Sequence, residues 1–185
     1  MANNANYVST GKPNISGAVY VAPLGTAVPA DASTDLDSAY KCLGYVSEDG
    51  LENNNEMDVS AIKAWGGMIV YRSLNELNDN FALTLIESEN PEVLKAVYGA
   101  DHVKEITVGD GTEIEVDIVA ENPEECVWVF ELSLRGDKKK RIVVPNGAVT
   151  SRDTITYNDS DAIGYGITVS AYPDASGGTH KEYIA

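Results

Sequence analysis

The sequence predicts a mainly β fold, a β-sandwich or barrel with one flanking α-helix. Short segments rich in Val, Ile and Tyr recur along the chain between turns that contain glycine or proline, which is typical of sandwiches and barrels. Several segments alternate apolar with polar residues, as half-buried strands do. Helical capping signals occur at about residues 90–99 alone. A length of 185 residues corresponds to one domain, which we expect at residues 16–173.

The N-terminal part predicts an arm, two strands and a loop. Residues 1–15 are polar and are expected to form a flexible arm. Residues 17–22 and 40–46 are the first strand candidates, and a turn is expected at residues 48–50. Between the two strands, residues 23–38 are rich in Pro, Ala, Ser and Asp and predict a long loop. A loop of this length is usually functional, or becomes ordered only when something binds it.

Strand patterns on both sides of Gly66 and Gly67 predict a hairpin over residues 59–72. The strands expected in this part of the chain are residues 51–65, 68–74 and 80–87. Alternation in the last of them predicts one buried face. The residues of that face are Phe81, Leu83 and Leu85.

One helix is expected at about residues 90–99. Asn90 is a preferred N-cap residue, Pro91 suits the first turn, and Glu92 complements the positive end of the helix dipole. Gly99 is the expected C-terminal stop. A single helix among many strands indicates that it flanks the β domain.

The second half of the chain is expected to consist of strands and to end in a polar tail, residues 174–185. The expected strands are residues 105–108, 112–119, 126–135, 138–144, 154–157 and 162–172. Turns are expected at residues 109–111 and at Gly136-Asp137, because glycine and aspartate suit hairpin turns.

Composition and charge exclude several classes of function. The chain has 29 acidic and 13 basic residues and a net charge of −16, so it lacks the basic footprint of a nucleic-acid-binding protein. No apolar run approaches the roughly 18 residues of a membrane span, and the start of the chain has no signal-peptide pattern. We therefore expect no membrane association and a location in the cytoplasm of the cell that makes the protein. Cys42 and Cys126 permit a disulfide but do not require one.

The sequence has no catalytic, cofactor or metal motif. His102 and His180 are the two histidines, and they are expected in a loop and in the tail. The acidic groups at residues 31–37 and 158–161 do not fit the calcium-binding loop of an EF-hand, and turn chemistry accounts for them. The sequence therefore predicts no enzyme activity, no cofactor and no metal.

Two sets of acidic residues alternate along predicted strands. Residues 101–125 hold nine acidic residues and one lysine, a net charge of −8. In the strand at 112–119, Ile114, Val116 and Ile118 are expected to point inward. The outward residues of this strand are Glu113, Glu115 and Asp117, and those of the strand at 51–65 are Glu52, Glu56 and Asp58. An acidic strand face is normally a solvated one.

Two further segments allow two interpretations each. The basic run Lys138, Lys139, Lys140 and Arg141 is either a solvated strand edge or an electrostatic contact with acidic residues of a neighbouring subunit. The tip of the hairpin at residues 59–72 is too apolar for a free tip. Either Trp65 is a core residue beside a tight turn, or the tip inserts into another subunit.

Residues 61–99 carry a recurring combination of motifs. These are Lys63, the Ala-Trp-Gly-Gly sequence at 64–67, a strand that ends at Glu87, and an Asn-Pro-Glu helix from Asn90 to Gly99. The combination resembles the major tail tube protein of long-tailed bacteriophages. The resemblance implies a structural virion protein of which six copies form a ring. Inner hairpins would join into one barrel, rings would stack into a tube, and loops and terminal arms would bridge adjacent rings.

The resemblance also implies roles for the residue sets above. Both acidic sets, Glu113, Glu115 and Asp117 and Glu52, Glu56 and Asp58, become candidates for a lumen wall that repels passing DNA. The candidates for contacts between subunits or rings are Lys63, Trp65, Gly66, Gly67, Met68, Tyr71, Lys138, Lys139, Lys140 and Arg141. The implied partners are copies of the same chain, a tape measure protein, a tail initiator or baseplate and a tail terminator. DNA would pass as non-specific cargo, and the protein would be assembled in the host cytoplasm into the virion tail.

Two other functions fit the sequence. A monomeric β-sandwich module for adhesion, carbohydrate binding or virion decoration would present exposed aromatic residues. A head–tail connector or tail terminator would form a single ring and no tube. Electron microscopy of the purified protein distinguishes tubes, single rings and monomers.

Overall fold

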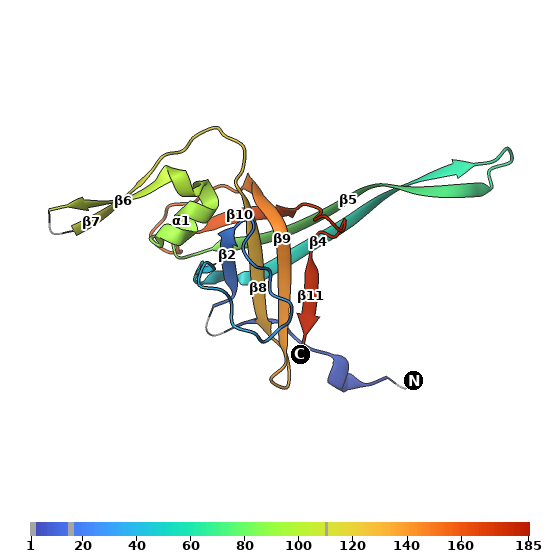
Figure 1. Cartoon of the computed structure of the whole chain (residues 1–185), viewed down its shortest axis with the longest axis horizontal. Coiled ribbons are helices and arrows are strands. Elements are labelled where there is room, and N and C mark those ends of the chain that lie inside the picture. The colour runs from blue at the N-terminus through green and yellow to red at the C-terminus, as the bar shows by residue number, and fades with distance from the viewer. Residues whose placement is uncertain (1–2, 15–16, 110) are drawn as a thin grey trace.

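The structure is a computed structural model of the chain that describes residues 3–14, 17–109 and 111–185. Over these residues it confirms a mainly β fold with one α-helix (Figure 1). The elements are η1 (Ala5–Tyr7), β1 (Lys12–Pro13), β2 (Val19–Pro23), β3 (Lys41–Cys42), β4 (Val46–Lys63), β5 (Ile69–Leu85), α1 (Pro91–Tyr98), η2 (Ala100–His102), β6 (Val103–Val108), β7 (Gly111–Val116), β8 (Glu125–Ser133), β9 (Lys139–Arg152), β10 (Tyr165–Ala171) and β11 (Lys181–Ile184).

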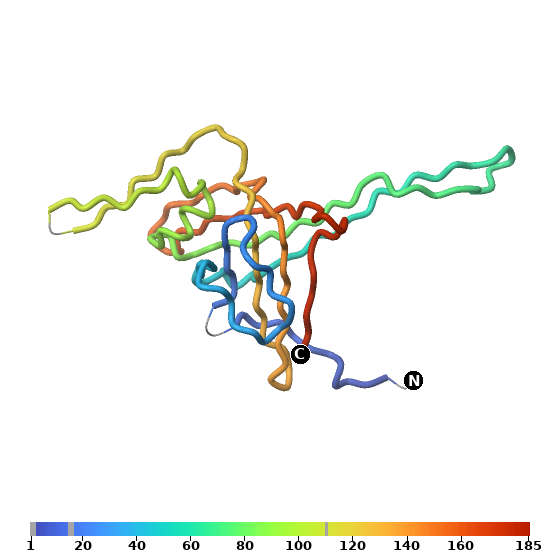
Figure 2. The backbone as a smooth tube through the Cα atoms, viewed as in Figure 1, coloured from blue at the N-terminus to red at the C-terminus, as the bar shows by residue number. Residues whose placement is uncertain are grey.

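Most strands belong to one sheet that does not close into a barrel. Its order is β3-β2-β8-β9-β10-β5-β4, with β1 paired to β8 and β11 paired to β9. Strands β6 and β7 form a separate two-stranded sheet. β9 joins the two halves of the main sheet, because its first part pairs with β8 and β11 and its last part pairs with β10. The path of the chain through both halves can be followed in Figure 2.

The main sheet folds over where β9 passes Gly147. The register between β8 and β9 shifts between Cys126 and Trp128, and the Trp128 indole N–H donates to the Gly147 carbonyl oxygen at 3.2 Å. A Cβ atom on Gly147 would lie only 3.0 Å from Val144 Cγ1 and 3.2 Å from Val169 Cγ1. Such a close approach favours glycine, and it lets the two halves of the sheet enclose a core.

The core lies between the two halves of the sheet. Phe81 and Phe130 stack with 5.2 Å between their ring centroids, and Trp128 stacks on Phe130. The largest other fully buried side chains of this core are Leu43, Leu85, Ile167, Val19, Val93 and Val144, whereas Val127, Val129 and Val143 form a second cluster with Ala22 and Tyr40. The predicted buried face of residues 80–87 is confirmed, since Phe81, Leu83 and Leu85 are all buried.

Helix α1 confirms the predicted helix and both of its caps. The Asn90 side chain accepts a hydrogen bond from the Glu92 backbone N–H at 3.0 Å, and Gly99 follows the helix with a φ of 102°. Val93 and Val97 are buried and join the core, so α1 covers one end of it with its apolar side. No helix in the described part of the chain is long and apolar enough to cross a membrane.

Strands β4 and β5 are longer than predicted. They form one antiparallel hairpin from Val46 to Leu85. The predicted turn at residues 48–50 was wrong, because the chain instead makes an irregularity inside β4 between Val46 and Leu51. The predicted interruption between residues 74 and 80 was also wrong, because β5 continues through it.

Two predictions in the C-terminal part were wrong. Residues 154–157 form no strand. Residues 174–185 were expected to be an unpaired tail, but they contain β11, which pairs with the first part of β9. The turn at Gly136-Asp137 is confirmed between β8 and β9, whereas the turn expected at residues 109–111 includes residue 110, which lies outside the described residues. The two cysteines are free thiols.

The loop at residues 23–38 packs on the outer side of the sheet. Arg141, only 4% exposed, donates from Nη1 to the Asp31 carbonyl oxygen at 2.9 Å and forms an ion pair with Glu131. The Tyr40 hydroxyl donates to the Ala27 carbonyl oxygen at 3.0 Å. The loop is therefore anchored within a single copy of the chain.

The substitution Phe81→Ala is expected to lower the free energy of unfolding by about 3–5 kcal/mol, because it removes a buried ring and leaves a cavity. Urea denaturation followed by circular dichroism measures this loss. Tyr45→Ala is the control: Tyr45 is exposed, and a surface change of this kind is expected to alter stability by about 0.5 kcal/mol or less. Equal losses in the two variants would contradict the placement of Phe81 in the core.

Candidate functional site

The hairpin of β4 and β5 extends far beyond the body of the protein (Figure 1). β10 pairs with β5 only from Asn80 to Leu85. Beyond Asn80, β4 and β5 pair only with each other among the described residues. Unpaired backbone N–H and C=O groups therefore line both edges of this extension, and each edge is a template for another strand.

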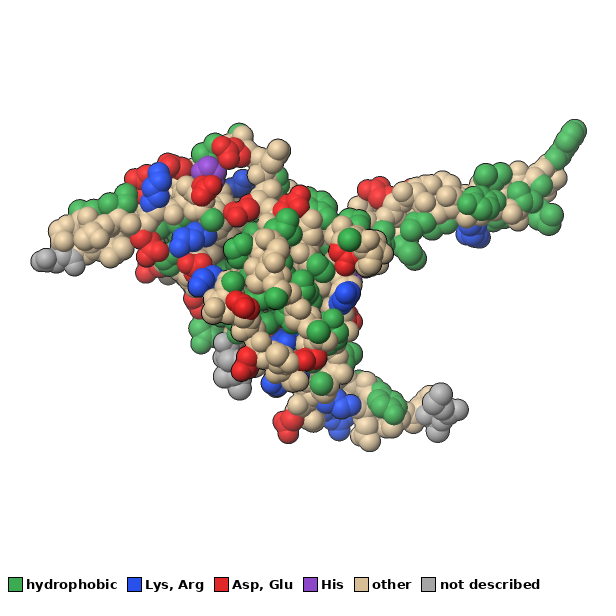
Figure 3. Space-filling model, viewed as in Figure 1, with side chains coloured by type: hydrophobic (Ala, Val, Ile, Leu, Met, Phe, Trp, Pro, Cys, Tyr) green, Lys and Arg blue, Asp and Glu red, His purple; other side chains and the backbone are tan. Residues whose placement is uncertain are grey.

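One face of the extension continues the core-facing side of β5. Residues directly opposite each other in an antiparallel pair share a face. This face, which we call the apolar face, carries the opposed pairs Met57–Leu77 and Val59–Leu74, together with Ile69 nearer the tip, where Arg72 and Lys63 share it. All five apolar side chains are exposed, and Figure 3 shows hydrophobic side chains along the hairpin. A cluster of exposed apolar side chains of this size is typical of an interaction site.

A β-bulge at Asn75 keeps Leu74 and Leu77 on the apolar face. The strands pair residue by residue on either side of it, so Asn75 has no opposite residue. Its side-chain amide donates to Asp58 Oδ2 at 3.0 Å and to Ser60 Oγ at 2.5 Å. In a regular strand, side chains three positions apart point to opposite faces; because Asn75 is an extra residue in a bulge, Leu74 and Leu77 share one face. Because of this bulge, the alternation of apolar and polar residues in the sequence did not predict the apolar face.

The opposite face of the extension is acidic. Glu52, Glu56 and Asp58 share it, and Glu76 lies opposite Asp58 and adds a fourth carboxylate. All four are exposed. The sequence prediction missed Glu76 because it placed no strand over residues 75–79. The hairpin is therefore apolar on one face and acidic on the other.

The tip of the hairpin is exposed. The Ala64 backbone N–H donates to the Met68 carbonyl oxygen at 2.8 Å, and Gly66 and Gly67 have φ angles of 98° and 89°, which glycine adopts readily. Trp65 is 107% exposed, so the interpretation of Trp65 as a core residue was wrong. The other exposed large apolar residues beside the tip are Ile62, Met68, Ile69, Val70 and Tyr71.

The root of the hairpin is held by the carboxylate of Asp79, which is 2% exposed. Asn53 Nδ2 donates to Asp79 Oδ1 at 2.9 Å, Thr179 Oγ1 donates to Oδ2 at 2.6 Å, and His180 Nδ1 contacts the same oxygen. Burial raises the pKa of Asp79, but hydrogen bonds from Thr179, Asn53, His180 and Asn55 together hold that pKa below its ordinary value of 3.8. The cluster ties the C-terminal segment to the point where the hairpin leaves the core.

The acidic residues of β6 and β7 lie on a different element. Lys104 Nζ is 3.7 Å from Glu115 and 3.5 Å from Asp117, whereas Glu113 has no ion pair among the described residues. Ile118, predicted to point inward, is exposed because it lies beyond the end of β7. The β6–β7 and β4–β5 hairpins project from opposite sides of the body (Figure 1). The two acidic sets therefore form no common surface within one copy.

The basic run divides into exposed and internal residues. Lys138 and Lys139 are exposed beside the β8–β9 turn. Lys140 forms an ion pair with β11 at 2.7 Å, and Arg141 is buried against Glu131. The expectation that Arg141 contacts another subunit was therefore wrong, because its guanidinium is enclosed within its own.

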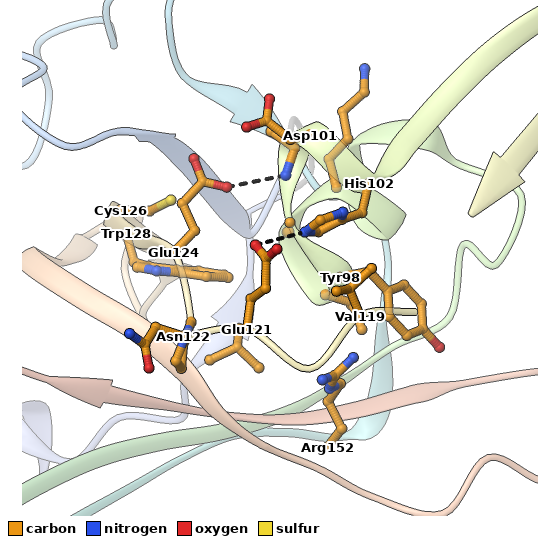
Figure 4. Close-up of a pocket in the computed structure, with 17 residues that line it drawn as sticks. Tyr98, Asp101, His102, Val119, Glu121, Asn122, Glu124, Cys126, Trp128 and Arg152 are labelled. Carbon is orange, nitrogen blue, oxygen red and sulfur yellow. Dashed lines mark hydrogen bonds and ion pairs between the residues drawn. The ribbon is translucent and has the colours of Figure 1, made fainter. Parts of the chain in front are cut away.

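A polar pocket of about 370 Å³ lies between α1, η2 and residues 117–124 (Figure 4). His102 Nε2 is 3.3 Å from Glu121, and Glu124 accepts a backbone hydrogen bond at the start of η2 at 3.1 Å. Burial, with a contribution from Glu124, raises the pKa of the Cys126 thiol to about 11, so this thiol is protonated at neutral pH. Within the described ranges no group of His, Cys, Asp and Glu is placed to hold a metal ion. The arrangement offers no activated nucleophile.

Comparison with known proteins gives one family. A family model described as phage tail tube protein matches residues 1–185. No curated protein matches the chain. Among solved structures, the chain is similar to the anti-feeding prophage cap, described as the AFP tube terminating cap and determined by cryo-electron microscopy. That similarity has a TM-score of 0.44 and 12% sequence identity, and it covers 100% of both chains.

The substitution Asp79→Asn is expected to lower the free energy of unfolding by about 1–3 kcal/mol near neutral pH, because it weakens a buried hydrogen-bonded cluster. The pKa of Asp79 is lower in the folded state, so its contribution is complete above the unfolded pKa and is lost as pH falls through the folded pKa. Urea denaturation at neutral pH and below pH 3.8 measures both effects. Glu76→Gln, on an exposed position, is the control. If Asp79→Asn lowers the free energy of unfolding by as much in acid as at neutral pH, that result would contradict a lowered pKa for Asp79 in the folded state.

Proposed function

Because the chain belongs to the phage tail tube protein family, we propose that copies of it form rings that stack into the tube of a phage tail. The observation that carries the proposal is the apolar face of the β4–β5 hairpin, which is exposed in one copy and lies between two free strand edges. Neighbouring copies would cover this face and pair with these edges. The protein is a structural component of the virion, and none of the proposed roles involves catalysis or a cofactor.

The two free edges suit a closed ring. The β4 edge of one copy would pair with the edge of β5 beyond Asn80 in the next copy, a head-to-tail contact that closes when the rotation between copies divides a full turn. Each apolar side chain that becomes fully buried contributes roughly 1.5–3 kcal/mol. Six copies would bring their hairpins together into one continuous barrel, as the family resemblance implies.

The acidic face of the hairpin would line the lumen. With its apolar face turned toward the bodies of the ring, the hairpin directs its carboxylates inward. Two unit charges 4 Å apart in water interact by only about 1 kcal/mol, but the repulsion recurs in every copy and keeps DNA phosphates off the wall. The residues concerned are Glu52, Glu56, Asp58 and Glu76. The acidic residues of β6 and β7 are weaker candidates, because two of them pair with Lys104.

The tip of the hairpin would insert into the adjacent ring. Its apolar side chains have no cover within one copy, and a neighbouring ring would supply it. The residues of this contact are Lys63, Trp65, Gly66, Gly67, Met68 and Tyr71.

Other tail proteins would meet the tube in its lumen and at its ends. A tape measure protein would occupy the lumen before DNA passes, an initiator or baseplate would begin the tube, and a terminator would end it. Assembly would take place in the host cytoplasm, and the product would be the tail of the virion.

Replacing Met57 and Leu77 by serine is expected to abolish tubes and rings while leaving a folded monomer. Both residues are exposed in one copy, so the change costs the monomer little but removes apolar contact between copies. Negative-stain electron microscopy shows the assemblies, and circular dichroism checks the fold. The matched control, Glu56→Gln with Glu76→Gln on the opposite face, should still form tubes. A wild-type protein that stays monomeric, or that forms single rings only, would reject the tube in favour of a binding module or a connector.

Trp65→Ala is expected to block stacking of rings without unfolding the protein, because Trp65 contacts nothing in its own copy. Sedimentation separates rings from tubes, and microscopy identifies each fraction. Normal tubes from this variant would count against insertion of the tip.

A further inference from the structure

The two ends of the body carry opposite charge. Figure 1 shows the β8–β9 turn with the N-terminal segment at one end of the body, and α1 with β6 and β7 at the other. Seven of the 13 basic residues of the chain lie in or beside the elements that meet at the turn. They are Lys12, Arg135, Lys138, Lys139, Lys140, Arg141 and Lys181.

Part of this positive charge has no counter-charge within the copy. Lys140 and Arg141 form internal ion pairs. The exposed cations that have no carboxylate partner among the described residues are Lys12, Arg135, Lys138 and Lys139. β1 places Lys12 beside β8, and the Arg135 backbone N–H donates to Ser9 Oγ at 2.7 Å. The turn and the N-terminal segment therefore present one mainly basic surface, which we call the turn surface; Asp137, in the turn itself, is an exposed acidic residue within it.

The opposite end is acidic and includes an element with few contacts of its own. Residues 101–125 carry a net charge of −8, and Figure 3 shows acidic side chains, with some basic ones among them, at this end of the body. Among the described residues, β6 and β7 pair only with each other, and Val103 is the buried residue that anchors them. A two-stranded sheet is marginally stable by itself, so a second contact would stabilise it. The exposed face of this sheet carries Glu113 and Glu115, with Asp117 just beyond. Lys104 shares this face and pairs with Glu115 and Asp117, so Glu113 is the carboxylate of the three without an ion pair among the described residues.

We infer that the turn surface of a copy in one ring docks on the acidic face of β6 and β7 of a copy in the adjacent ring. The inference rests on the proposed tube. When identical bodies stack head to tail, their opposite ends meet. The turn surface of each copy would therefore face the acidic end of a copy in the adjacent ring. Nucleic acid is the other ligand for a basic surface, but the net charge of −16 repels it.

The same charges orient each new ring. A ring added in reverse would bring two turn surfaces or two acidic faces together, and like charges across an interface are unfavourable. The contact is between exposed charges, which salt screens. Tubes should therefore grow in one direction and more slowly at high ionic strength.

Charge reversal tests the contact. Lys138→Glu with Lys139→Glu should raise the protein concentration needed for tubes by about tenfold or more, because it replaces attraction with repulsion. Single rings should still form, since the β4–β5 hairpin is unchanged. Adding Glu113→Lys and Glu115→Lys to the same chain should restore tubes. The single variant Lys138→Glu should show a smaller defect of the same kind, and Lys41→Glu, an equal change of charge at an exposed lysine away from the turn, is its matched control.

The outcomes separate this inference from the proposed function. Tubes from the wild type and equally from the reversed variant would reject the inference and leave the tube in place. A defect that the compensating pair does not restore would also reject it. Binding of a DNA duplex that the reversal abolishes, without an effect on tubes, would assign the turn surface to nucleic acid instead. A wild-type protein that never forms tubes would reject the proposed function and the inference with it.

Discussion

One face of β5 is apolar along most of its length, and a single copy of the chain covers only part of it. Phe81, Leu83 and Leu85 lie in the core, whereas Leu74 and Leu77 lie outside on the continuation of the same face. Removal of apolar surface from water favours folding and association alike. The inner part of one strand therefore organises the body, and its outer part remains available to neighbouring copies in the proposed tube.

The boundary between these two parts is polar. Asp79 lies where the core ends, and Asn53, Thr179 and His180 satisfy its carboxylate. A buried charge is tolerated only when it is paired or hydrogen-bonded, so the C-terminal segment must lie at this position. From there the chain returns along β9 as β11. The contacts of Thr179 and His180 with Asp79 thus lie at the point where the folded body ends and the exposed hairpin begins.

Local signals in the sequence predicted the local structure, but they did not predict the contacts between distant segments. The caps of the helix at residues 90–99 depend on neighbouring residues, so they could be predicted. The length and the apolar face of the hairpin could not, because Leu74 and Leu77 are three positions apart and share a face only through a bulge. The cluster of Asp79 with Thr179 joins residues 100 positions apart, a pairing that no spacing in the sequence reveals.

The bulge at Asn75 also constrains how the hairpin can change in evolution. Side chains alternate between faces, so the loss of one regularly paired residue would exchange the apolar and acidic faces from that point to the tip. Asn75 and Val70 are exceptions, because neither has an opposite residue and the loss of either one would leave every other pair in register. Related chains should therefore differ in hairpin length by matched residues in both strands, or by the presence or absence of an unpaired residue such as Asn75 or Val70.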